Sequence, residues 1–265
     1  SATAMRADPD KLRRVIINLV GNALDAFEEQ KSALEKTQRL AKEKLGLEWI
    51  LETHAHADHL SGAQYIKSRI GGTVAIGEGI RKVQAHFGPI FNLGGDFAPD
   101  GHQFDRLFSD GDTFTIGGLE CEVIATPGHT NDSVSYRIGS AVFVGDSMFM
   151  PDFGTARCDF PGGDAGLLYD SIQRILSLPG DTQLYMCHDY MPGGRELRWV
   201  CTVDEQRSEN IHVNADVDKA GFVKMRSQNT NSVRAGAFGS GGAASVPPSS
   251  PPSCLPPAPA RLRFG

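Results

Sequence analysis

The chain lacks any apolar run of the roughly 20 residues that a membrane-spanning helix needs, and it lacks a recognisable signal peptide. Its five cysteines show no paired spacing of the kind that indicates a disulfide framework. They are Cys121, Cys158, Cys187, Cys201 and Cys254. These absences predict a protein without a membrane partner, in a reducing cytoplasm.

Basic residues are also too few for a nucleic-acid surface. Lysine and arginine number 26 against 32 acidic residues, for a formal net charge of -6, so no nucleic-acid partner is expected. No internal repeat is visible in the 265 residues, of which 40% are hydrophobic. Such a chain can bury one medium-sized core. Composition therefore sets wide bounds and agrees with a soluble enzyme.

The most informative segment present is Thr53-His54-Ala55-His56-Ala57-Asp58-His59, which directly follows the apolar run Leu47 to Leu51. The alternation in His-x-His points both rings to one side of an extended chain. The turn that follows brings Asp58 and His59 back toward the same point. Histidine is the commonest metal ligand, and burying so many ionisable groups without a cation is costly. The segment therefore predicts a metal site at the end of a strand.

Three later apolar runs also end in candidate ligands. The run 122–126 leads to His129, the run 141–144 leads to Asp146, and the run 183–187 leads to His188. Each run is typical of a strand. Glycines beside His129 and Asp146 let the backbone turn tightly and approach an ion closely. Together, these strand ends are expected to complete the metal site.

The ordered motifs T-H-A-H-A-D-H, T-P-G-H-T, V-G-D and C-H-D-Y resemble those of the metallo-β-lactamase superfamily. The resemblance implies an α/β fold, the αββα sandwich, over residues 46–226. Such a domain normally has several strands before its His-x-His strand, but a charged helical stretch at 31–44 stands in their place. We therefore expect the first strands to be missing and a sheet edge to be exposed.

Within this superfamily, the stretch 153–160 and the triplet His188-Asp189-Tyr190 resemble the persulfide dioxygenases, which are similar to glyoxalase II. The resemblance implies one Fe(II) per chain, held by His54, His129 and Asp146. Two histidines and a carboxylate form the facial triad that leaves positions on non-haem Fe(II) open for substrate and dioxygen. The expected reaction oxidises glutathione persulfide to sulfite and glutathione.

The remaining motif residues receive supporting roles from the same resemblance. His56, Asp58, His59 and His188 would orient the ligands and tune the metal. Arg157 matches the active-site arginine of the dioxygenases, and its guanidinium can clamp a glutathione carboxylate through two hydrogen bonds. Tyr190 matches a tyrosine near the open metal positions. A surface arginine and a packing tyrosine are the competing interpretations of these two catalytic candidates.

The same ligands could instead hold two zinc ions. His54, His56 and His129 would bind one ion and Asp58, His59 and His188 the other, with Asp146 bridging them. A hydroxide between the ions would attack a glutathione thioester, as in glyoxalase II. Imidazole and carboxylate suit both metals, so only the neighbouring residues favour the dioxygenase. An inactive fused or truncated fragment is the third hypothesis.

The two ends of the chain differ from the rest. Residues 1–30 contain an amphipathic helix that resembles the N-box of sensor histidine kinases, with Asn22 at the magnesium-binding position. The glycine boxes that should follow are absent, so we expect a fusion or remnant without kinase activity. Gly, Ser, Ala and Pro dominate residues 227–265, which predicts a disordered tail.

The order of elements between the motifs predicts sheets with helices outside. Helices are expected at 63–69, 167–178 and 203–210, a strand at 73–76, a loop at 87–101, and two hairpins through Gly117-Gly118 and Gly139-Ser140.

Overall fold

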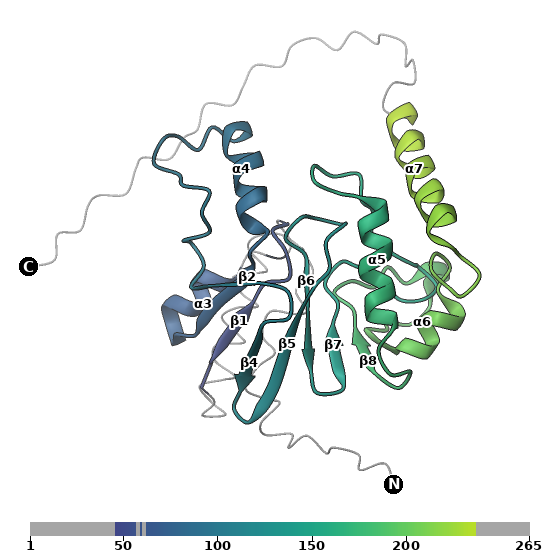
Figure 1. The fold of residues 1–265 in the computed structure, drawn as a ribbon, viewed down its shortest axis with the longest axis horizontal. Coiled ribbons are helices and arrows are strands. Elements are labelled where there is room, and N and C mark those ends of the chain that lie inside the picture. The colour runs from purple at the N-terminus through teal and green to yellow at the C-terminus, as the bar shows by residue number, and fades with distance from the viewer. Residues whose placement is uncertain (1–45, 57–58, 60–61, 237–265) are drawn as a thin grey trace, which may run out of the picture.

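The computed structural model describes residues 46–56, 59 and 62–236 (Figure 1). The N-box-like segment 1–30, the stretch 31–44, Asp58 and residues 237–265 lie outside the described residues. No helix in the described part of the chain is long and apolar enough to cross a membrane.

Two sheets form the centre of the fold. The first has three parallel strands in the order β1 (Trp49–Leu51), β2 (Thr73–Gly77) and β3 (Arg106–Phe108). The second has six strands in sequence order, β4 (Thr113–Ile116), β5 (Leu119–Ala125), β6 (Val134–Ile138), β7 (Ala141–Phe143), β8 (Gln183–Tyr185) and β9 (Val200–Thr202). Neighbours in this sheet are antiparallel except β7 and β8, which are parallel. The helix α5 lies in the connection between those two strands, as a parallel crossover requires.

Helices lie on the two outer sides of the pair of sheets (Figure 1). On the side of the first sheet lie α3 (Ala63–Ile70) and α4 (Ile80–Ile90). On the side of the second sheet lie α5 (Ala165–Leu176), α6 (Val203–Glu209) and α7 (Lys219–Gly236), and a short 3-10 turn spans Pro192–Gly194. The αββα sandwich expected from the sequence is therefore confirmed.

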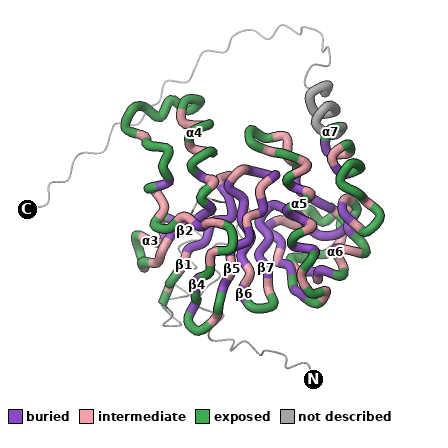
Figure 2. The backbone as a smooth tube through the Cα atoms, viewed as in Figure 1, coloured by how far each residue is buried: buried purple, intermediate pink, exposed green. Residues whose placement is uncertain are grey.

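The buried apolar side chains form three layers, one between the two sheets and one beneath the helices on each outer side. Alternation along the strands explains this division. Successive side chains of a strand point to opposite faces, so Ile50 packs toward α3 while Leu51 packs between the sheets. In β7, Val142 likewise joins the helix side with Leu168, while Phe143 joins the layer between the sheets. Most strand residues are buried or intermediate, whereas much of α4 is exposed (Figure 2).

Capping residues fix where two helices begin. Asp164 accepts a hydrogen bond from the Leu167 N–H and starts α5. Thr202 and Glu205 form a reciprocal capping box at the start of α6. Because α5 follows the loop that carries Arg157, this cap also fixes where that loop ends.

Most of the predicted elements between the motifs are confirmed, with small shifts at their ends. The expected loop at 87–101 is wrong over residues 87–90, where α4 continues to Ile90. This helix has no side-chain cap and contains Gly88 and Pro89 near its end, so local signals argue against it. The helix α7 reaches Gly236, so it includes residues 227–236 that the sequence assigns to the tail.

Candidate metal centre

The predicted ligands follow four strands that end near one another. His54 follows β1, His129 follows β5, Asp146 follows β7 and His188 follows β8. The side chains of His54, His129 and Asp146 are buried, with residue exposures of 0%, 4% and 7%. The strand ends therefore bring residues from distant parts of the sequence to one buried place.

The first group of ligand atoms, called cluster A, consists of His54 Nε2, His56 Nδ1, His129 Nε2 and Asp146 Oδ2. His56 Nδ1 lies 3.1 Å from the Nε2 atoms of both His54 and His129. Asp146 Oδ2 lies 3.9 Å from His54 Nε2 and 3.8 Å from His129 Nε2. Cluster A thus brings three imidazole nitrogens together, with one carboxylate oxygen within 3.9 Å of two of them.

The second group, called cluster B, uses the other oxygen of the same carboxylate. Asp146 Oδ1 lies 3.4 Å from His59 Nε2 and 3.4 Å from His188 Nε2. The two Nε2 atoms are 3.2 Å apart. Asp58, the remaining predicted member, lies outside the described residues. Asp146 therefore joins the two clusters through separate oxygen atoms.

The separations fit metal ligation. Two atoms that each lie about 2.1 Å from one ion are about 3.0 to 4.2 Å apart for angles from 90° to 180°. The four distances given for cluster A, 3.1 to 3.9 Å, and the three for cluster B, 3.2 to 3.4 Å, fall in this range. Imidazole and carboxylate are also a donor set that iron and zinc both accept. The residues present therefore fit a metal centre.

The protonation states favour ligation as well. Burial, followed by electrostatic interaction with His59, holds the pKa of His54 well below its usual range, so its ring is neutral. Burial alone would raise the pKa of Asp146, but hydrogen bonds with His188 and His59 outweigh that effect and hold this pKa well below its usual range. A metal needs a neutral imidazole and an ionised carboxylate, and the site holds both in those forms.

Hydrogen bonds from Thr53 and to the Arg157 carbonyl lie behind the candidate ligands and orient their rings. The Thr53 hydroxyl oxygen lies 3.0 Å from His54 Nδ1 and 3.5 Å from His59 Nδ1. His129 Nδ1 lies 2.6 Å from the backbone carbonyl of Arg157 and donates to it when Nε2 faces the cluster. Sequence reasoning missed both supports, although Thr53 is adjacent to the first histidine.

Arg157 lies at the rim of the site, with its side chain 53% exposed. Its Nε and Nη2 atoms donate to the two carboxylate oxygens of Asp159 at 2.6 Å each. Its guanidinium also lies 4.6 Å from the centre of the Phe160 ring. That ring in turn packs edge-on against His56 and His129. Nothing in the sequence pattern indicated that Phe160 touches two candidate ligands.

Tyr190 lies beyond cluster B and is 52% exposed. Its ring stacks on Phe153 at 4.3 Å and lies 6.0 Å from the His188 ring. The loop that carries it is held by Arg195, which pairs with the buried carboxylate of Asp189 at 2.6 Å and also with Asp152. The two catalytic candidates, Arg157 and Tyr190, thus accompany different clusters.

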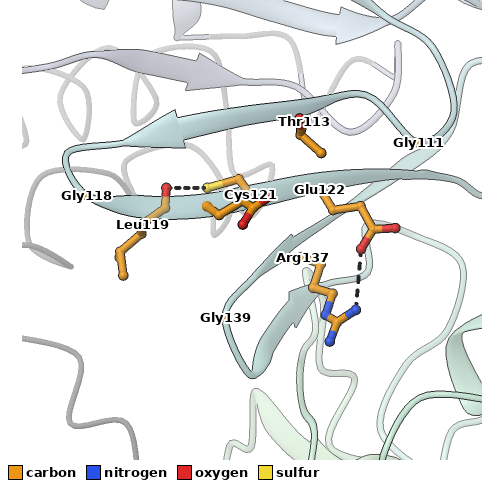
Figure 3. A pocket seen from close by; sticks show the side chains of 9 residues that line it. Gly111, Thr113, Gly118, Leu119, Cys121, Glu122, Arg137 and Gly139 are labelled. Carbon is orange, nitrogen blue, oxygen red and sulfur yellow. Dashed lines mark hydrogen bonds and ion pairs between the residues drawn. The ribbon is translucent and has the colours of Figure 1, made fainter.

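A surface cavity of about 590 Å³ lies elsewhere, toward the start of β5 (Figure 3). Its lining includes Thr113, Cys121 and Glu122, and Arg137 pairs with Glu122 at 3.4 Å. Burial raises the pKa of the Cys121 thiol to about 12, so this cysteine is not a nucleophile. No residue with a predicted catalytic or metal-binding role lines this cavity.

Residues 24–188 match the family model described as "Metallo-beta-lactamase superfamily". The chain belongs to this superfamily. The match begins inside the segment 1–30, and the comparisons do not support the histidine-kinase resemblance proposed for that segment.

Curated relatives of this metallo-β-lactamase superfamily member include a "Probable metallo-hydrolase" of Burkholderia pseudomallei, 50% identical over 205 residues that make up 74% of this chain and 70% of the relative. "Glyoxylase B2" of Dictyostelium discoideum is 50% identical over 198 residues, 74% of this chain and 68% of the relative. The chain spans less than half, 47%, of a "Beta-lactamase hydrolase-like protein" of Xylella fastidiosa, to which it is 48% identical.

Among solved structures, ETHE1 from Myxococcus xanthus is similar with a TM-score of 0.61 and 30% sequence identity. The similarity covers 82% of this chain and 80% of ETHE1. This superfamily member is therefore a metal-binding protein in which His and Asp side chains form the centre, and a metalloenzyme by family. Its sandwich delivers those ligands from strand ends and leaves Arg157, Phe160 and Tyr190 partly exposed around them.

Proposed function

We propose that this protein is an iron-dependent persulfide dioxygenase that converts glutathione persulfide, dioxygen and water into glutathione, sulfite and protons. The hydrogen bond between His129 Nδ1 and the Arg157 carbonyl carries the proposal. Residues 153–160 are the stretch that resembles the persulfide dioxygenases, and through this bond they support His129, which we propose as a metal ligand. Similarity to ETHE1, a persulfide dioxygenase, adds to the argument.

His54, His129 and Asp146 would hold the iron in cluster A. Bound iron would supply adjacent open positions for a persulfide sulfur and dioxygen. Holding both reactants at one centre removes much of the entropic part of the barrier. The neutral state of His54 and the ionised state of Asp146 suit this role.

The surrounding side chains would handle the rest of the substrate. The Nε edge of Arg157 is paired with Asp159, but the guanidinium also has Nη1, which can donate to a glutathione carboxylate. Phe160 packs against the rings of His56 and His129 and would limit the access of water to them. The exposed Tyr190 would lie next to the bound substrate, on the side of His188.

A dinuclear zinc hydrolase of glutathione thioesters is the second candidate. The observation in its favour is the division of Asp146, with Oδ2 in cluster A and Oδ1 in cluster B. In a two-metal site a shared carboxylate of this kind lets a hydroxide lie between the ions. The names of two relatives, a probable metallo-hydrolase and a glyoxylase, also agree with this alternative.

Elemental analysis and two activity assays distinguish the candidates. The purified chain is loaded with Fe(II) or Zn(II), then tested for oxygen uptake and sulfite release with glutathione persulfide and for cleavage of a glutathione thioester. The proposal expects about one iron per chain and oxygen uptake matched by sulfite. Thioester cleavage by a two-zinc form without oxygen uptake would establish the hydrolase. Loss of both metals and both activities would indicate an inactive fragment.

A further inference from the structure

A buried carboxylate lies behind the His-x-His segment without touching a candidate ligand atom in the contacts described. Asp132 lies in the loop between β5 and β6 and is 1% exposed. Its Oδ2 atom accepts a hydrogen bond from the backbone N–H of Ala55 at 2.8 Å. Ala55 is the residue between His54 and His56, both members of cluster A. A side chain 77 positions away therefore holds the backbone that separates two ligands.

The turn that carries this carboxylate lies close against two glycines, Gly77 and Gly79. A Cβ atom at Gly77 would lie 2.5 Å from the Asp132 carbonyl oxygen, and one at Gly79 would lie 2.3 Å from the Asn131 carbonyl oxygen. The turn is thus packed against the backbone between β2 and α4, at positions where only glycine fits. The backbone of Asp132 is fixed by this packing, and its side chain transfers that fixed position to Ala55.

Burying a carboxylate is costly unless its hydrogen bonds compensate. Burial raises the pKa of Asp132, and the hydrogen bond from the Ala55 N–H is among the interactions that partly oppose the rise. Oδ1 is buried with no hydrogen-bond partner among the described residues, whereas Oδ2 accepts the Ala55 N–H. An apolar residue would avoid the cost of burial, so the specific use of the carboxylate is its contact with the Ala55 N–H.

We infer that Asp132 is a positioning residue of the metal centre, which sets the direction of the His54-Ala55-His56 segment by accepting the Ala55 N–H. It acts through backbone geometry and does not bind the metal. The inference holds for an iron or a zinc centre. A failed oxygen-uptake assay would therefore refute the dioxygenase proposal without affecting this one.

The test uses Co(II) as the metal probe, because its visible absorption reports coordination geometry. Asp132→Ala should weaken Co(II) binding by about 10- to 100-fold, the usual effect of removing a group that orients a ligand, and should shift the Co(II) spectrum. Asp132→Asn keeps an oxygen acceptor of the same reach and should stay within about threefold of the unaltered protein. If the alanine variant does not fold, Asp132→Leu fills the same space without an acceptor and carries the same expectation.

Asp105→Ala is the control for loss of a carboxylate that accepts a backbone N–H away from the site, since Asp105 Oδ2 accepts from Val74 at 2.9 Å, its other oxygen pairs with Lys67, and it adjoins no ligand. This control should lower the melting temperature of the metal-free protein and leave Co(II) affinity and spectrum unchanged. Unaltered Co(II) binding in both Asp132→Ala and Asp132→Leu would overturn the inference. So would an equal loss in Asp132→Asn, because the charge and not the acceptor would then matter.

Discussion

Removal of the Arg157 side chain tests how the proposed substrate is held. Arg157→Ala deletes the guanidinium but keeps the backbone carbonyl that supports His129. The metal centre should therefore stay intact while the contact with a substrate carboxylate is lost. The variant separates substrate binding from metal binding. Substitution of His54, His129 or Asp146 would change both at once.

The expected change in KM follows from the pairing of Arg157 with Asp159. That carboxylate already occupies Nε and Nη2, which leaves Nη1 as the main donor for a substrate. A hydrogen bond that involves a charged group contributes about 1.5 to 3 kcal/mol. With the Arg157 side chain 53% exposed, solvent screening places the value near the lower end of that range. Since 1.4 kcal/mol is a factor of ten, KM for glutathione persulfide should rise about tenfold.

Steady-state oxygen uptake on iron-loaded protein measures this effect, with iron content determined on the same samples. The kcat should stay within about twofold, because the lost contact binds substrate and transition state equally. Asp159→Asn is the companion variant, and it should lower KM because it removes a competing negative charge. An unchanged KM in Arg157→Ala, or a loss of iron, would refute this assignment of the side chain.

Three further predictions concern the metal centre and acid stability. His129→Ala should abolish iron retention, whereas His59→Ala should reduce it less. If elemental analysis gave the reverse order, the assignment of the iron to cluster A would be wrong. Thr53→Val should weaken metal binding about 10-fold and Thr53→Ser should restore it, as chelator competition would show. Burial, with the charge of Arg226, lowers the pKa of His212 to about 4. The contribution of this neutral histidine to the free energy of unfolding is therefore full above about pH 6.5 and is lost as the pH falls from there toward 4. Between pH 7 and pH 5 the free energy of unfolding of the metal-free protein should fall by about 1 kcal/mol more than that of the His212→Gln variant, after allowance for the partial exposure of the ring. Urea unfolding at the two pH values measures both changes.

The strand ends of the site were predictable because their signals are local. Short apolar runs followed by glycine and a polar side chain identify β5 before His129 and β7 before Asp146. The His-x-His alternation likewise needs only a few neighbouring residues. Motif order then supplied the family, and through it the αββα sandwich.

The supports of the ligands were not predictable, because they join residues far apart in sequence. The contact of Asp132 with Ala55 and that of the Arg157 carbonyl with His129 depend on how the two sheets and their loops pack. The helix α4 was missed for a local reason, since Gly88 and Pro89 argue against a helix that packing nevertheless stabilises at Ile80. Tertiary context overrides propensity in such cases.

The division of Asp146 between two clusters makes their occupancies interdependent. A cation in either cluster takes up much of the carboxylate charge and adds positive charge a few ångströms from the other cluster. The second ion therefore binds with a less favourable free energy than the first, which is negative cooperativity between neighbouring positions. We therefore expect the number of ions per chain to vary with the supply of metal. One-metal and two-metal forms would then be neighbouring states of a single polypeptide, set by the free concentration of the ion and not by a change of fold.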